Sequence, residues 1–144
     1  MKVAIGSDHA GFELKEALKK FMLEEGIEFI DVGTHSEERV DYPDFAKKVC
    51  EKLKEGKADY GVLICGTGLG MSIAANKCRG IRAALCLFPE MARLARSHNN
   101  ANVLVLAGRL MGKEIAKWTL RTFLQTDFEG GRHERRIQKL EGME

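Results

Sequence analysis

Two short segments of the sequence place reactive side chains beside glycines. One is Gly6-Ser7-Asp8-His9-Ala10-Gly11, and the other is Cys65-Gly66-Thr67-Gly68-Leu69-Gly70-Met71-Ser72. Residues 66–70, which we call the anion cradle, can point backbone N–H groups and a helix amino terminus at one spot, where they would stabilise an anion. Cys65 borders this anion cradle, and a thiol in such a place can lose its proton near neutral pH and act as a general base. A base beside an anion site is what enolisation next to a carbonyl requires, so we expect no metal and no cofactor.

Other glycine-rich loops match this segment poorly. It lacks the lysine and the spacing of a P-loop, and its G-x-G-x-G pattern differs from the G-x-G-x-x-G of dinucleotide-binding proteins. The first strand runs into Asp8, whose carboxylate would repel a pyrophosphate, although Asp31 stands where a ribose-binding acid could be. A tight strand-to-helix turn without a ligand stays open as the simplest interpretation.

Strand and helix patterns alternate along the chain and must position these segments. Apolar, β-rich runs predict strands at 2–6, 28–32, 60–65, 82–85 and 102–106. Helical periodicity fills the gaps between them, and it returns at 112–124 after the last strand. The alternation predicts an α/β fold: a single doubly wound three-layer domain over residues 1–144, with a five-stranded parallel sheet in the order 2-1-3-4-5. A C-terminal helical extension is expected at about residues 130–144.

This strand order predicts where a ligand binds. Open α/β sheets bind ligands outside the carboxyl ends of their strands, at the point where the strand order reverses. In the expected order that point lies between the first and third strands, and the two reactive segments directly follow these strands. The sequence therefore predicts a pocket formed by both segments.

Composition limits the classes of partner and compartment. The 144 residues carry a net charge of only +2, which gives no electrostatic reason to expect a nucleic-acid partner or a membrane partner. No secretory signal or long apolar run is evident, and none of the four cysteines forms a C-x-x-C pair. We therefore expect reduced thiols and a cytoplasmic protein.

The last segment is basic and follows a Gly130-Gly131 joint. On a helix, His133, Ile137 and Leu140 would form one stripe, with Arg132 and Arg136 together on its edge. A pair of arginines beside a docking stripe could hold a phosphate. A solvated basic tail is the alternative.

At these residues the chain resembles the type B ribose-5-phosphate isomerases, within the wider family that includes galactose-6-phosphate isomerase subunits. The resemblance spans essentially the whole chain. Beyond the two reactive segments, the matching motifs are Asp41-Tyr42-Pro43, His98-Asn99-Asn100-Ala101-Asn102, Gly108-Arg109 and Arg132-His133-x-x-Arg136.

The resemblance implies that ribose 5-phosphate and ribulose 5-phosphate are interconverted through an enediolate. Cys65 would move the proton between C1 and C2, His98 would be the acid that opens the furanose ring, and Thr67 would assist. No carboxylate follows Gly70 at the place where another branch of the family has a glutamate base, so the sequence fits the cysteine branch.

The resemblance also assigns the binding residues by the part of the substrate that each would hold. The enediolate oxygens would meet the backbone of Gly66, Gly68, Leu69 and Gly70. Sugar hydroxyls would meet Asp8 and Asn99 in a pocket lined by Tyr42. The phosphate would be gripped by His9, Arg109, Arg132 and Arg136.

The position of His98 indicates a second subunit. The expected helix at 89–97 follows the fourth strand and covers about 13 Å, which is comparable to the length of a short strand. His98 should therefore lie at the opposite edge of the sheet from Cys65 of the same chain. We expect a homodimer with active sites shared across the interface, and pairing of dimers into a tetramer is left open.

Two other functions stay open at this point. The substrate could be a six-carbon sugar phosphate, such as allose or galactose 6-phosphate, because sequence does not give the volume around the sugar's far end. A flavodoxin-like module that binds a phosphorylated ligand without turnover is the second alternative.

Overall fold

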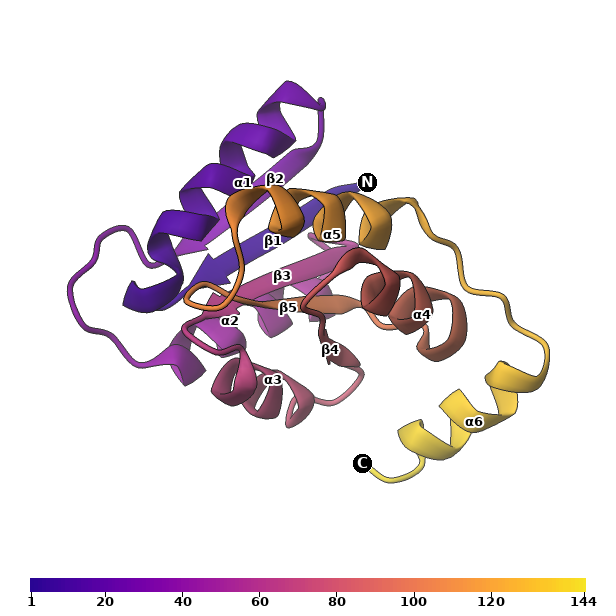
Figure 1. Cartoon of the computed structure of the whole chain (residues 1–144). Helices are drawn as coiled ribbons and strands as arrows, with labels where there is room; N and C mark the ends of the chain where they lie inside the picture. Colours follow the sequence, from indigo (N-terminus) through magenta and orange to yellow (C-terminus); the bar gives the residue numbers. More distant parts are fainter.

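The computed structural model describes residues 1–144 and contains a five-stranded parallel sheet with helices on both faces (Figure 1). The expected α/β fold class is confirmed. The strands are β1 (Lys2–Ser7), β2 (Glu28–Gly33), β3 (Tyr60–Cys65), β4 (Ala83–Leu85) and β5 (Val103–Ala107). A short 3₁₀ turn η1 (His9–Gly11) precedes the helices α1 (Phe12–Glu24), α2 (Tyr42–Lys54), α3 (Leu69–Asn76), α4 (Pro89–Asn99), α5 (Lys113–Gln125) and α6 (Arg132–Glu141). No helix has the length and apolar character that crossing a membrane requires.

The strand order is 2-1-3-5-4, so the expected order 2-1-3-4-5 is wrong at its far end. β5 pairs with β3 along five positions from Gly61–Val103 to Cys65–Ala107, and β4 forms the edge of the sheet. The burial of the two strands explains why β5, and not β4, lies next to β3. All five residues of β5 are buried, whereas the three residues of β4 are only partly buried. A short, half-exposed strand suits an edge better than the centre of a sheet.

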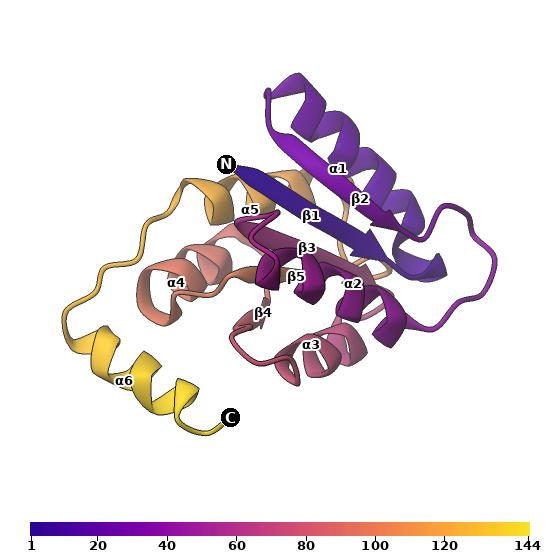
Figure 2. The same cartoon turned by 180° about the vertical axis from the view of Figure 1, so that it is seen from behind.

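The observed order also fixes which face each helix covers. A right-handed crossover places its helix on one face when the chain moves one way along the sheet, and on the other face when the chain moves back. The chain moves outward from β3 to β4 and then back to β5. Accordingly, α3 shares a core cluster with α2, whereas α4 shares the opposite cluster with α1 and α5. Figure 2 shows the face covered by α2 and α3.

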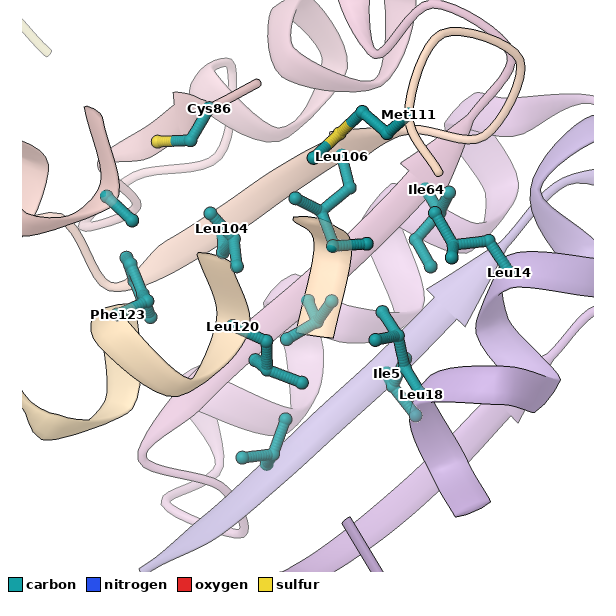
Figure 3. Close-up of a cluster of buried hydrophobic side chains, with 14 of the residues drawn as sticks. Ile5, Leu14, Leu18, Ile64, Cys86, Leu104, Leu106, Met111, Leu120 and Phe123 are labelled. Atoms are coloured by element: carbon teal, nitrogen blue, oxygen red, sulfur yellow. The ribbon is translucent and has the colours of Figure 1, made fainter. Parts of the chain in front are cut away.

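The larger core cluster lies under α1, α4 and α5 (Figure 3). Leu18, Leu104, Leu120 and Phe123 are completely buried there, and residues 62–65 of β3 and 103–106 of β5 alternate between the two clusters. Burial of one such side chain stabilises the fold by about 1.5–3 kcal/mol. Packing on both faces therefore holds the carboxyl ends of β1, β3 and β5 in place.

A buried ion pair joins α1 to the end of β2. The Lys15 side chain is fully buried, and its Nζ lies 2.7 and 2.6 Å from the two carboxylate oxygens of Asp31. Lys19 Nζ and the Gly33 N–H also contact this carboxylate, at 2.8 and 2.9 Å. Burial alone would raise the pKa of Asp31, but the hydrogen bonds from Lys15, Lys19 and Gly33 lower it below its usual value. Asp31 is thus occupied by structural partners.

We predict that Asp31→Asn lowers the free energy of unfolding by about 3 kcal/mol at pH 7, because the buried Lys15 charge keeps only the more distant Glu16 carboxylate, at 3.5 Å. Because folding lowers the pKa of Asp31, the stabilisation is present above the unfolded value of about 3.9 and is lost as pH falls below it. Urea unfolding from pH 7 to pH 3 measures both effects. The double variant Lys15→Met/Asp31→Asn should recover part of the loss, and a loss below about 1 kcal/mol for Asp31→Asn would contradict the prediction.

Candidate active site

Backbone hydrogen bonds tie together the three strand ends that form the site. Gly108 N–H donates to Cys65 O at 2.8 Å, and Arg109 N–H donates to Gly66 O at 2.9 Å. On the other side of β3, Asp8 N–H donates to Ile64 O at 3.2 Å. The segments that follow β1, β3 and β5 therefore meet at one edge of the sheet. The predicted pairing of the first and third strands is confirmed, since β1 pairs directly with β3; a ligand crevice at this edge stays a prediction.

Two glycines allow this close approach. A Cβ on Gly11 would lie 2.5 Å from Ile64 O, and a Cβ on Gly108 would lie 2.8 Å from Ala10 O. Both contacts are with backbone, which cannot swing aside as a side chain can. The positions therefore need glycine for space.

The anion cradle forms the turn from β3 into α3. Gly68 has a φ of 77°, a left-handed conformation that favours glycine. Thr67 Oγ1 accepts a hydrogen bond from Leu69 N–H at 3.3 Å, so the hydroxyl expected to assist catalysis also caps this turn. The N–H groups of Gly70 and Met71 belong to the first turn of α3, where no earlier helical carbonyl is available to them. Together with the helix dipole they favour a negative charge at this end.

Four of the predicted side chains surround the anion cradle or its neighbouring loops. Asp8 is buried, and its Oδ1 accepts the Gly11 N–H at 3.1 Å, which leaves Oδ2 as the oxygen for a ligand. His9 Nδ1 accepts the Val40 N–H at 3.3 Å, so in the neutral ring the proton is assigned to Nε2. A Cβ on Gly66 would lie 3.1 Å from a guanidinium nitrogen of Arg109, which places this side chain against the cradle.

Tyr42, the fourth side chain, begins α2 and lies against Gly70. A Cβ on Gly70 would come within 2.5 Å of the Tyr42 ring and 2.9 Å of its hydroxyl. The ring thus covers the start of α3, and a larger side chain at position 70 would have to displace it. The first turns of α2 and α3 therefore contact each other at this position.

The four cysteines differ in their surroundings. Burial raises the pKa of Cys86 to about 12, and burial with the neighbouring Cys78 thiol raises the pKa of Cys50 well above its usual value. These two remain protonated and suit the role of small apolar core residues. Cys65 is also buried, at 5% exposure, but it is the cysteine that borders the anion cradle.

The remaining predicted residues gather at the other edge of the sheet. α4 ends beside the amino ends of the strands: Asn102 O, just beyond it, accepts the Gly61 N–H at the start of β3 at 2.9 Å. Cys65 closes the opposite end of that same strand. The expectation that one chain does not bring His98 to its own Cys65 is therefore confirmed. The structure likewise places Asn99, Arg132 and Arg136 away from the anion cradle, on α4 and α6.

α6 carries its arginines next to His98. The rings of His98 and His133 stack, with centroids 4.3 Å apart and planes 13° from parallel. Arg132 precedes this histidine, and Arg136 follows one helical turn later. His98 and Asn99 at the end of α4, with Arg132 and Arg136 on α6, form a group that we call the histidine half-site.

Glu129 completes a cluster that the sequence patterns did not reveal. Its Oε2 lies 3.5 Å from His98 Nε2, and the ligand atoms of His98, Glu129 and His133 lie within 4.8 Å of one another. Metal-binding lone pairs of imidazole lie in the ring plane, and two nearly parallel planes cannot aim theirs at one ion. The cluster as arranged suits proton chemistry better than metal binding.

The fold and the site define a class: an α/β protein with a doubly wound sheet, in which a thiol lies beside a helix amino terminus that favours negative charge. Comparison with known proteins makes this specific. The family model described as Ribose/Galactose Isomerase matches residues 3–140. The chain belongs to this family.

Individual relatives are similar to this chain over nearly their full lengths. Ribose-5-phosphate isomerase B of Escherichia coli is 47% identical over 143 residues, which cover 99% of this chain and 96% of that protein. A ribose 5-phosphate isomerase structure from Thermotoga maritima superposes with a TM-score of 0.97 at 67% identity, covering 98% of this chain and 97% of that one. Ribose-5-phosphate isomerase B of Mycoplasma genitalium with bound ribulose-5-phosphate gives a TM-score of 0.94 at 41% identity, covering 99% and 95%.

We predict that Gly70→Ala lowers the free energy of unfolding by about 1 kcal/mol, because the new methyl group meets the Tyr42 ring. In a Tyr42→Ala background the same substitution should stabilise the protein, because alanine is the better helix former. Denaturant unfolding of the four variants of this cycle measures the change of sign. Gly142→Ala is the control, because Gly142 has right-handed helical backbone angles and its Cβ would make only ordinary contacts, at 3.5 Å or more. A Gly70→Ala effect that is independent of residue 42 would contradict the prediction.

Proposed function

We propose that this protein interconverts ribose 5-phosphate and ribulose 5-phosphate, with Cys65 as the proton-transferring base. The observation that carries the mechanism is the position of Cys65 at the border of an anion cradle, where a base and a developing oxyanion would be neighbours. The names of the relatives support the choice of a five-carbon substrate.

The reaction begins with ring opening. His98 donates a proton to the ring oxygen of the furanose as the bond from this oxygen to C1 breaks, and the C1 hydroxyl releases its proton to solvent water to give the open-chain aldehyde; His98 regains a proton from solvent. Cys65 as thiolate then removes the proton from C2, and the electron pair moves to form the C1–C2 double bond. The negative charge that develops on O1 is held by the backbone N–H groups of the anion cradle.

The second half of the reaction reverses this proton transfer at the neighbouring carbon. A proton passes from O2 to O1, the carbonyl forms at C2, and the Cys65 thiol returns its proton to C1. The net change moves one hydrogen from C2 to C1 and one from O2 to O1. Atoms and electrons balance without an external reductant, oxidant or cofactor. The phosphate would be held by His9 and Arg109 from one side, and by Arg132 and Arg136 from the other.

Two subunits would complete each site. The histidine half-site of one chain would face the anion cradle of its partner, so that a two-fold dimer holds two equivalent sites. Large apolar side chains near the cradle and at the start of α4 support an interface there, because they are exposed in the single chain. They are Leu69, Ile73, Leu87 and Phe88. α6 stands apart from the sheet, joined to α5 by an extended segment (Figure 1), and could reach across such an interface.

We also place the protein in the cytoplasm. The substrate is a phosphorylated sugar, which does not cross a membrane unaided, and the base must remain a free thiol. A reducing compartment satisfies both conditions.

We predict that Cys65→Ala lowers kcat for ribose 5-phosphate at least a thousandfold, because it removes the group that transfers the proton. Incorporation of solvent deuterium into C1 of ribulose 5-phosphate should stop as well, whereas binding of the sugar phosphate should change little. Proton NMR measures the exchange, and calorimetry measures the binding. Cys78→Ala removes a thiol outside the site and serves as the control. Retention of full turnover by Cys65→Ala would refute the mechanism.

Subunit mixing tests the shared site. Homodimers of Cys65→Ala and of His98→Ala should both be nearly inactive, whereas each heterodimer should contain one intact site. After complete random exchange, about a quarter of the wild-type activity per chain should return, since half of the dimers are mixed and each has one working site. Mass spectrometry of the intact dimers verifies the exchange. No recovery after verified exchange would show that sites are not shared.

A further inference from the structure

The segment 126–131, which joins α5 to α6, is held against α4 by two hydrogen bonds to its backbone. Arg96 Nε donates to Thr126 O at 3.1 Å, and Glu129 N–H donates to Ser97 O at 3.0 Å. Arg96 is itself buried and also bonds Ala101 O at 2.7 Å. The backbone of Glu129 is therefore held next to the last turn of α4 by the fold.

Its carboxylate faces His98. Oε2 of Glu129 lies 3.5 Å from Nε2 of His98, a separation at which a carboxylate and an imidazolium attract each other. The His98 side chain is 37% exposed and the Glu129 side chain is 53% exposed, so both can adjust when a substrate binds. Nδ1 is the ring nitrogen that this contact leaves for another partner.

His133 is the buried member of the cluster. It is 5% exposed, its ring stacks on His98, and its buried Nε2 has no hydrogen-bond partner. Burial lowers the pKa of His133, and the positive charges of His98 and Arg132 act in the same direction. Of the two stacked rings, His133 is therefore the poorer proton carrier, and the Glu129 carboxylate lies beside the other, more exposed ring of His98.

We propose that Glu129 is a positioning residue for ring opening. Its carboxylate accepts the Nε2–H of His98, the neutral ring of His133 supports His98 from below, and Nδ1–H is thereby presented to the ring oxygen of the sugar. A carboxylate that binds one ring nitrogen of a histidine orients the ring and determines which nitrogen donates the proton to the substrate. The proposal rests on the proposed function, in which His98 donates a proton to the furanose.

The chemistry of the two substrates separates this role from a structural one. Ribose 5-phosphate closes to a furanose, which must be opened before C2 can be deprotonated. Ribulose 5-phosphate has its carbonyl at C2 and a phosphate on O5, so no hydroxyl is available to close a five-membered ring. Exchange of its C1 hydrogen with solvent deuterium needs Cys65 and the anion cradle but does not need ring opening.

The test compares wild type, Glu129→Gln, Glu129→Asp and Asp127→Asn. We expect Glu129→Gln to lower kcat for ribose 5-phosphate about tenfold, which is part of the rate gain that a general acid supplies. KM should stay within about twofold of the wild-type value. Deuterium exchange at C1 of ribulose 5-phosphate should stay at the wild-type rate. Glu129→Asp keeps the carboxylate and should recover part of the loss. Asp127→Asn removes the same charge from the same exposed segment and should change neither rate.

Either of two results would overturn the proposal. An unchanged kcat for Glu129→Gln would show that His98 does not need the carboxylate. Equal losses in both assays, or an equal loss in Asp127→Asn, would show a general structural or electrostatic effect. Failure of the proposed function looks different, because wild type itself would then neither isomerise ribose 5-phosphate nor exchange the C1 hydrogen of ribulose 5-phosphate.

Discussion

The close contact of three strand ends is the constraint on which the site depends. Gly11 lies against the Ile64 carbonyl and Gly108 lies against the Ala10 carbonyl, so the segments after β1, β3 and β5 touch through backbone. Contacts between backbones leave little freedom for adjustment. The N–H groups of the anion cradle therefore have fixed directions before any ligand arrives, and a developing negative charge costs no reorganisation of the protein. The packed helices on both faces of the sheet maintain this contact.

Much of this arrangement could be predicted from the sequence. Alternating strand and helix patterns predicted the α/β class, and the expected strand order correctly placed the ends of β1 and β3 side by side, with Cys65 at the end of β3. The order of β4 and β5 could not be predicted, because periodicity shows that a segment is a strand but not which strand lies beside it. The error matters for Arg109. It reaches Gly66 because β5 is the direct neighbour of β3, and in the expected order β4 would have separated them.

Contacts between side chains that are distant in sequence are the second feature that the sequence patterns could not predict. Asp31 had the spacing of a ribose-binding acid, yet its carboxylate is occupied by Lys15 and Lys19 from α1. Glu129 belongs to no motif and looks like an ordinary surface acid, and only the fold brings it to His98. The length of the helix at α4, in contrast, was enough to predict that His98 and Cys65 lie at opposite edges, because this depends on helix rise alone.

The separation of acid and base within one chain has a chemical consequence. A thiolate and an imidazolium in direct contact would pair with each other, whereas here Cys65 and His98 of the same chain lie at opposite edges of the sheet. In the proposed dimer they would meet only across the substrate, which takes up a proton from one and gives a proton to the other. Exposed apolar residues such as Leu69 and Ile73 would then be covered by the partner, which helps to exclude water from a reactive enediolate. Assembly and catalysis would therefore depend on the same surface.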